Sequence, residues 1–65
     1  MDGLNYYLSK TVRITVNNFN TAYYYEGKVT DITPDFLTLL DKKIGTVSVR
    51  ISNIISIKEL NEGRM

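Results

Sequence analysis

Residues 21–32 read Thr-Ala-Tyr-Tyr-Tyr-Glu-Gly-Lys-Val-Thr-Asp-Ile, and this stretch decides the fold. Its aromatic and β-branched residues favour an extended strand. Gly27 lies in the middle of that strand, where a glycine typically marks a bulge or a sharp bend. Small barrels turn their corners at such bends, so the stretch predicts one long strand that bends hard at Gly27.

Four further segments predict strands, and in two of them, residues 10–16 and 46–52, apolar and polar residues alternate with a period of two, which is typical of half-buried strands. These segments are residues 10–16, 36–40, 46–52 and 54–60. Turn-forming residues separate the strands, at positions 17–20, 33–35, 41–45 and 53. Five short strands, one of them bent, predict a small and strongly twisted barrel.

The first residues predict a short helix over about residues 2–9. Asp2 fits the N-cap position, and Leu4, Tyr7 and Leu8 recur at the spacing of one apolar stripe on a helix. The alternative for this segment is a frayed terminus without regular structure.

The expected fold class is therefore mostly β. A short N-terminal helix at about 2–9 precedes a five-stranded, strongly bent antiparallel small barrel at about 10–60. Residues 61–65 form a polar tail, and the chain forms a single domain over residues 1–65.

The small size of the chain predicts that its subunits associate. A chain near 60 residues buries only about 60% of the surface that its unfolded form exposes, so its core is marginal alone. The sequence has no cysteine and no histidine, which removes disulfides and the usual zinc ligands as sources of stability. The β-branched strands at 46–52 and 54–60 carry little charge, and such edges pair with other chains.

Composition excludes several classes of protein. Hydrophobic residues make up 43% of the chain and charged residues 23%, so the chain is not expected to be disordered. Its apolar runs are far shorter than a membrane span, and no basic segment precedes them, so no signal peptide is expected and the expected location is the cytoplasm. The net charge of +1 does not indicate a polyanion partner, so nucleic-acid binding would need local placement of charge.

The elements in this order resemble the Sm/LSm superfamily, which includes bacterial Hfq and archaeal Sm-like proteins. The resemblance spans roughly residues 4–60. Residues 4–14, Leu-Asn-Tyr-Tyr-Leu-Ser-Lys-Thr-Val-Arg-Ile, are similar to the family's helix and first strand. Tyr25-Glu26-Gly27-Lys28-Val29 resembles the core of the first Sm motif, and Val49-Arg50-Ile51-Ser52-Asn53-Ile54 resembles the second.

Two departures from the family pattern bear on the site. Ile51 stands where the second motif has glycine, and Ser52 stands at its acidic position. The loop of the first motif reads Thr33-Pro34-Asp35-Phe36-Leu37, with Phe36 nearest the asparagine of the Sm proteins. An aromatic residue there is closer to Hfq, where the corresponding aromatic residue contacts uracil or adenine.

The resemblance implies an RNA-binding site of four residues: Phe36, Arg50, Asn53 and Asp35. An exposed Phe36 offers a stacking platform for a base, and the planar guanidinium of Arg50 stacks on a base and reaches its phosphate. The amide of Asn53 can read a base edge, whereas the family's loop aspartate, here Asp35, more often orients the loop.

Each of these residues also has a purely structural interpretation. Phe36 could be a core residue, Arg50 a surface arginine paired with Asp35 or Glu26, and Asn53 a turn residue. The tyrosines at 23–25 favour a subunit interface or strand propensity over RNA stacking.

Metal and enzyme chemistry are not expected. The aspartates at 31, 35 and 41 lack calcium-loop spacing, so no metal site or cofactor is expected. The chain has no histidine or cysteine for general-base or thiolate chemistry and no glycine-rich phosphate loop, which argues against an enzyme.

The leading hypothesis is a homo-oligomeric Sm-like ring, closed by strand-edge pairing, that binds single-stranded U- or A-rich RNA in RNA processing or riboregulation. The alternative is a small β-barrel scaffold that binds protein and not RNA, which Ile51 favours because a branched side chain could crowd the base pocket. A third possibility is a structural subunit of a larger particle.

Overall fold

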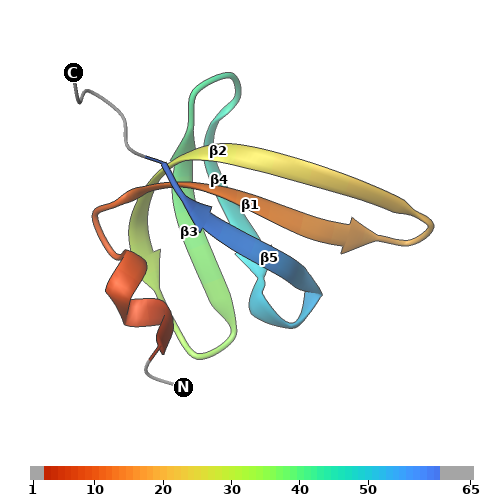
Figure 1. Ribbon diagram of the computed structural model, residues 1–65, viewed down its shortest axis with the longest axis horizontal. Coiled ribbons are helices and arrows are strands. Elements are labelled where there is room, and N and C mark those ends of the chain that lie inside the picture. The colour runs from red at the N-terminus through yellow and green to blue at the C-terminus, as the bar shows by residue number, and fades with distance from the viewer. Residues whose placement is uncertain (1–2, 61–65) are drawn as a thin grey trace.

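One antiparallel sheet of five strands forms the body of the protein, in a computed structural model that describes residues 3–60. The elements in chain order are η1 (Gly3–Tyr7), β1 (Thr11–Asn18), β2 (Thr21–Ile32), β3 (Phe36–Asp41), β4 (Gly45–Arg50), η2 (Ile51–Asn53) and β5 (Ile54–Glu59), where η denotes a 3-10 helix. The order across the sheet is β4-β3-β2-β1-β5, so β4 and β5 are its two edges (Figure 1). The prediction of a mostly β fold with five antiparallel strands is confirmed.

The core lies on one face of this bent sheet, where the apolar residues of the alternating segments meet. Seven side chains are buried: Val12, Ile14, Val16, Val29, Leu37, Leu39 and Val49. Tyr7, Tyr25 and Ile51 are among the half-buried side chains that pack against them. The period of two therefore identified the buried face of β1, β3 and β4 correctly.

The bend of β2 follows from its two partners. Residues Thr21–Lys28 of β2 pair with β1, and residues Gly27–Ile32 pair with β3, with a shift of register between Val29 and Asp31. The two pairings overlap only at Gly27 and Lys28. One strand thus contributes to both halves of the sheet, as the sequence predicted.

Gly27 is needed for a close approach between two strands. A Cβ atom at this position would overlap the carbonyl oxygen of Leu40 and lie 2.9 Å from the Cα of Asp41, both in β3. The φ angle of Gly27 is not in the left-handed region. Lack of a side chain, and not an unusual dihedral angle, is what the bend requires here.

The barrel expected from the sequence is not closed. No ladder joins β4 to β5 within residues 3–60, so both edges keep unpaired backbone groups. The expected small barrel is therefore corrected to an open, bent sheet, because its two edge strands, β4 and β5, lie at opposite ends of the strand order.

The helix expected at about 2–9 is also corrected. Only Gly3–Tyr7 is helical, as one short 3-10 segment, and Leu8 is 45% exposed. The backbone turns at Ser9, whose φ is 70° and whose N–H donates to the carbonyl of Val29 at 2.9 Å. The chain therefore joins the sheet before an α-helix gains enough backbone hydrogen bonds to offset its nucleation cost. Asp2 and residues 61–65 lie outside the described residues.

The fourth strand ends two residues earlier than predicted. It stops at Arg50 and not at Ser52, because Ile51–Asn53 form the 3-10 turn η2. The N–H of Ile51 donates to the carbonyl of Asp35 at 2.9 Å, which turns the chain away from the β3–β4 ladder.

The β1–β2 hairpin extends beyond the other strands (Figure 1). Asn18 pairs with Thr21 across a two-residue turn. In that turn, Phe19 has a φ of 60° and is 93% exposed. No helix among residues 3–60 is long and apolar enough to cross a membrane.

We expect Gly27→Val to lower the free energy of unfolding by about 1–3 kcal/mol, because the new side chain must push β3 away from β2. Urea denaturation followed by circular dichroism measures this change. Gly3→Ala is the matched control, since a Cβ atom at Gly3 meets nothing within 4 Å. Equal midpoints for Gly27→Val and wild type would contradict the close approach.

Candidate functional site

Two loops meet at one end of the sheet, as the resemblance to the Sm motifs implies. The loop that joins β2 to β3 and the turn η2 both lie at the lower end in Figure 1. Phe36 and Arg50 are direct partners in the β3–β4 ladder, and the N–H of Ile51 donates to the carbonyl of Asp35. Within the first loop, the N–H of Thr33 donates to the carbonyl of Phe36 at 2.8 Å. Backbone hydrogen bonds therefore hold the candidate residues in place.

Phe36 and Arg50 form a cation–π pair on the outer face of the sheet. The guanidinium carbon of Arg50 lies 5.2 Å from the centroid of the Phe36 ring. Phe36 alternates with the buried Leu37 and is 39% exposed, so it is not a core residue. The pair presents an aromatic face and a planar cation side by side, a combination that can stack on a flat, electron-rich ligand.

Arg50 makes no ion pair with any residue of the described chain. The acid named as its possible partner, Glu26, instead pairs with Arg13, whose guanidinium nitrogen lies 2.6 Å from the carboxylate. Asp35 contributes its backbone carbonyl, and its exposed side chain makes no hydrogen bond within residues 3–60. The charge of Arg50 is thus not neutralised at the surface.

Asn53 lies in the same turn, but no hydrogen bond joins its side chain to Phe36 or Arg50. It ends η2 and is exposed, and its side chain makes no hydrogen bond within the described part of the chain. The structure therefore brings Phe36, Arg50 and Asp35 together. Asn53 is the last residue of η2, and its amide is free of hydrogen bonds within residues 3–60.

Ile51, which replaces the glycine of the second motif, points away from the exposed pair. Its half-buried side chain packs against the core. It also lines an apolar hollow of about 340 Å³ with Leu4, Tyr7 and Ile54.

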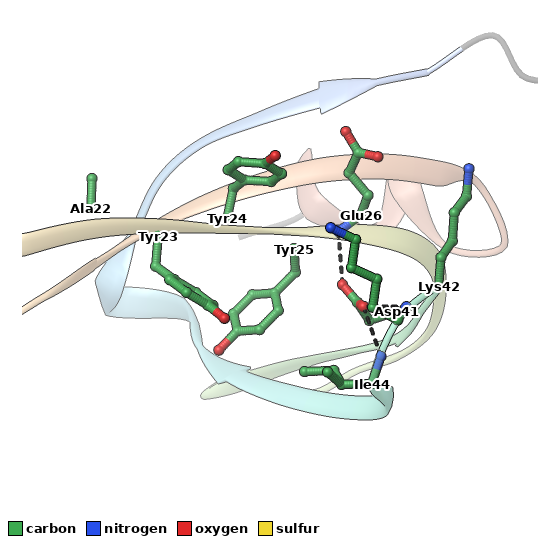
Figure 2. A pocket seen from close by; sticks show the side chains of 9 residues that line it. Ala22, Tyr23, Tyr24, Tyr25, Glu26, Asp41, Lys42 and Ile44 are labelled. Atoms are coloured by element: carbon green, nitrogen blue, oxygen red, sulfur yellow. Dashed lines mark hydrogen bonds between the residues drawn. The ribbon is translucent and has the colours of Figure 1, made fainter.

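A second hollow, of about 360 Å³, lies between β2 and the β3–β4 connection (Figure 2). We call it the tyrosine hollow; residues 22–26 and 41–44 line it. The rings of Tyr23 and Tyr25 point to one side of β2 and meet edge to face, 5.1 Å between centroids, whereas Tyr24 points to the opposite side. Sequence reasoning expected exposed tyrosines here but missed the hollow, because only the bend of β2 brings residues 22–26 near residues 41–44.

Asp41 organises the connection beside this hollow. Its Oδ1 accepts from the N–H groups of Lys43, at 2.7 Å, and Ile44, at 3.1 Å, and its Oδ2 accepts from the N–H of Glu26 at 3.0 Å. These hydrogen bonds, with that from Lys43 the strongest cause, lower the pKa of Asp41 below its ordinary value of 3.8. The carboxylate therefore joins β2 to the β3–β4 connection through hydrogen bonds.

Glu59, at the end of β5, is held by a tyrosine. The hydroxyl of Tyr6 donates to Oε1 of Glu59 at 2.8 Å. This hydrogen bond, together with the charge of the carboxylate, raises the pKa of Tyr6 above 10.0. The bond fixes one oxygen of Glu59 and leaves Oε2 without a hydrogen bond within residues 3–60.

Neither a metal site in the described part of the chain nor a similar protein of known function points to a further site. Among residues 3–60, no three histidine, cysteine or acidic side chains group as metal ligands do. No protein-family model, no curated protein and no solved structure matches this chain. Any proposal about function therefore rests on the geometry described above.

Asp41→Ala should lower the melting temperature at pH 7, because three backbone N–H groups lose their acceptor. Because the pKa of Asp41 is lower in the folded state than in the unfolded state, the carboxylate stabilises the fold fully at pH values above the unfolded-state pKa. This contribution is lost as the pH falls through the folded-state pKa. The gap between wild type and variant should therefore narrow as the pH falls from about 5 towards 3. Thermal melts across this range measure it, and a gap independent of pH would contradict the assignment.

Proposed function

We propose that this chain is a subunit of a ring-shaped homo-oligomer that binds single-stranded U- or A-rich RNA, as the resemblance to the Sm/LSm superfamily implies. The observation that carries the proposal is the exposed Phe36–Arg50 pair. The proposed role is non-enzymatic, in RNA processing or riboregulation.

The pair has the chemistry that an unstacked base requires. Single-stranded RNA is recognised by stacking of its splayed bases on aromatic rings or guanidinium planes. Stacking of this kind contributes about 1–3 kcal/mol per base. Arg50 has no competing carboxylate, so it is available to a base or phosphate, and the free amide of Asn53 offers both a donor and an acceptor to a base edge. Asp35 orients the loop through its carbonyl.

Repetition of this site around a ring would compensate for its small size. One pair per subunit and a net charge of +1 provide little affinity alone. A ring presents several pairs to one RNA strand, and each further contact is then intramolecular, which raises overall affinity greatly. The two open edges, β4 and β5, support pairing between neighbouring subunits.

The side chain of Ile51 packs against the core, and the ring of Phe36 is 39% exposed, which favours the RNA proposal over the scaffold alternative. One observation favours the alternative, a protein-binding scaffold without RNA binding. The β1–β2 hairpin carries exposed aromatic residues, Phe19 at 93% and Tyr24 at 58%, far from the proposed RNA site.

Phe36→Ala and Arg50→Ala should each weaken binding of oligo-U or oligo-A more than about tenfold, since avidity multiplies the loss at each site. Filter binding at fixed salt measures this, with sedimentation to verify that the oligomer is intact. Salt dependence should be shallower than for a binder dominated by phosphate contacts.

Matched controls isolate the pair from general aromatic or basic character. Phe19→Ala removes another exposed phenylalanine, and Lys58→Ala removes another exposed cation; both should bind RNA like wild type. Failure of wild type to bind either homopolymer, or unchanged binding by both site variants, would reject the RNA proposal and favour the scaffold.

Edge pairing gives a separate prediction. Ile55→Lys places a charge on the open edge β5, where Ile55 is 60% exposed, and should shift the oligomer towards monomer in sedimentation equilibrium. Leu40→Lys, at a site 52% exposed on the inner strand β3, is the control and should leave assembly unchanged. A wild type that is monomeric at micromolar concentration would contradict the proposed ring.

A further inference from the structure

The tyrosine hollow lies beside the open edge of the sheet. Ile44, which is 62% exposed, lines the hollow and immediately precedes β4. Figure 2 shows the rings of Tyr23 and Tyr25 pointing from β2 towards the side on which Ile44 lies. A strand added to the edge of β4 would therefore end against this hollow.

Three donor side chains that line the hollow, Tyr23, Tyr25 and Lys43, carry the argument. The hydroxyls of Tyr23 and Tyr25 make no hydrogen bond within residues 3–60, and the exposed ammonium group of Lys43 makes no ion pair there. Both acids that line the hollow already have partners: Asp41 accepts from three backbone N–H groups, and Glu26 pairs with Arg13. The hollow thus matches an incoming group that is partly apolar and ends in a carboxylate.

The two edge strands determine which residue of a second copy would arrive there. β4 and β5 have six residues each, Gly45–Arg50 and Ile54–Glu59. Flush antiparallel pairing sets Gly45 opposite Glu59 and Val47 opposite Ile57. This register also places core-facing residues opposite one another, because Val47 shares the face of Val49 and Ile57 pairs with the buried Ile14.

Glu59 has the complementary chemistry. It shares the core-facing side of β5 with Ile57, and only its Oε1 is held, by Tyr6. Gly45, opposite it, has no side chain and leaves room for the carboxylate. We propose that the tyrosine hollow is the docking site for the end of β5 of a second copy, whose Glu59 pairs with Lys43 and accepts from the tyrosine hydroxyls.

This inference rests on the proposed homo-oligomer and specifies its interface. It does not depend on RNA, because Phe36 and Arg50 lie at the other end of β4 from Gly45. Assembly and RNA binding can therefore be measured as separate quantities on the same variants.

The first experiment exchanges the charges across the interface. Lys43→Glu and Glu59→Lys should each raise the concentration for half-assembly about tenfold, and the double variant should return to within about threefold of wild type. Sedimentation equilibrium of the full chain measures this. Rescue distinguishes the intersubunit pair from loss of the Tyr6–Glu59 hydrogen bond, which a change at Lys43 does not restore. Single variants that assemble like wild type, or a double variant that is not rescued, would overturn the inference.

The second experiment compares two adjacent tyrosines with similar exposure. Tyr23 is 51% exposed and lines the docking side, whereas Tyr24 is 58% exposed on the opposite side. Tyr23→Ser should weaken assembly about tenfold, and Tyr24→Ser should not. Equal effects would overturn the inference.

Homopolymer binding by the same variants separates the two proposals. If wild type assembles but binds neither oligo-U nor oligo-A, the proposed RNA function is rejected and the proposed docking site is retained. If wild type binds RNA as a monomer, the proposed docking site is rejected and the proposed RNA contact is retained.

Discussion

The contact between the backbones of β2 and β3 at Gly27 is the constraint on which the rest of the structure depends. Because no Cβ atom stands between them, the strand can leave its ladder with β1 and enter its ladder with β3 within two residues. A flat sheet of five short strands would expose both faces, whereas the bent one encloses seven apolar side chains. The core of this small domain thus exists only because the strand can bend.

The bend also determines where the polar chemistry lies. It turns the ends of β3 and β4 towards one end of the molecule, where Phe36 and Arg50 meet, and carries the first half of β2 over the β3–β4 connection, where the tyrosine hollow forms. These two surfaces differ in character. One presents an unneutralised guanidinium beside an aromatic ring, and the other presents hydroxyl donors around an apolar space. The two ligands proposed above, a base and a carboxylate-bearing strand, would therefore bind at separate surfaces of one small chain.

Local patterns were sufficient to predict much of this arrangement from the sequence. Alternation of Val12, Ile14 and Val16 predicted the buried face of β1. The resemblance to the Sm motifs implied that the loops at 33–36 and 50–53 lie together, and a backbone hydrogen bond does join them. The type of the N-terminal helix, 3-10 and not α, could not be predicted from local sequence. It depends on the hydrogen bond from the N–H of Ser9 to the carbonyl of Val29, which joins residues far apart in the sequence. The tyrosine hollow was missed for the same reason, since residues 22–26 and 41–44 approach only through the folded bend.

The position of β5 has a consequence for the order in which the chain folds. Three of the four ladders join strands that are adjacent in sequence and can form as hairpins, but the ladder between β1 and β5 joins Val12 to Glu59, near the two ends of the described chain. Closing so long a loop costs more conformational entropy than closing a hairpin, and non-local pairings of this kind form slowly. The strand β5, which completes the fold, also carries one of the two free edges and the Glu59 carboxylate. If this ladder forms last, the proposed oligomer would assemble only from chains that have already folded.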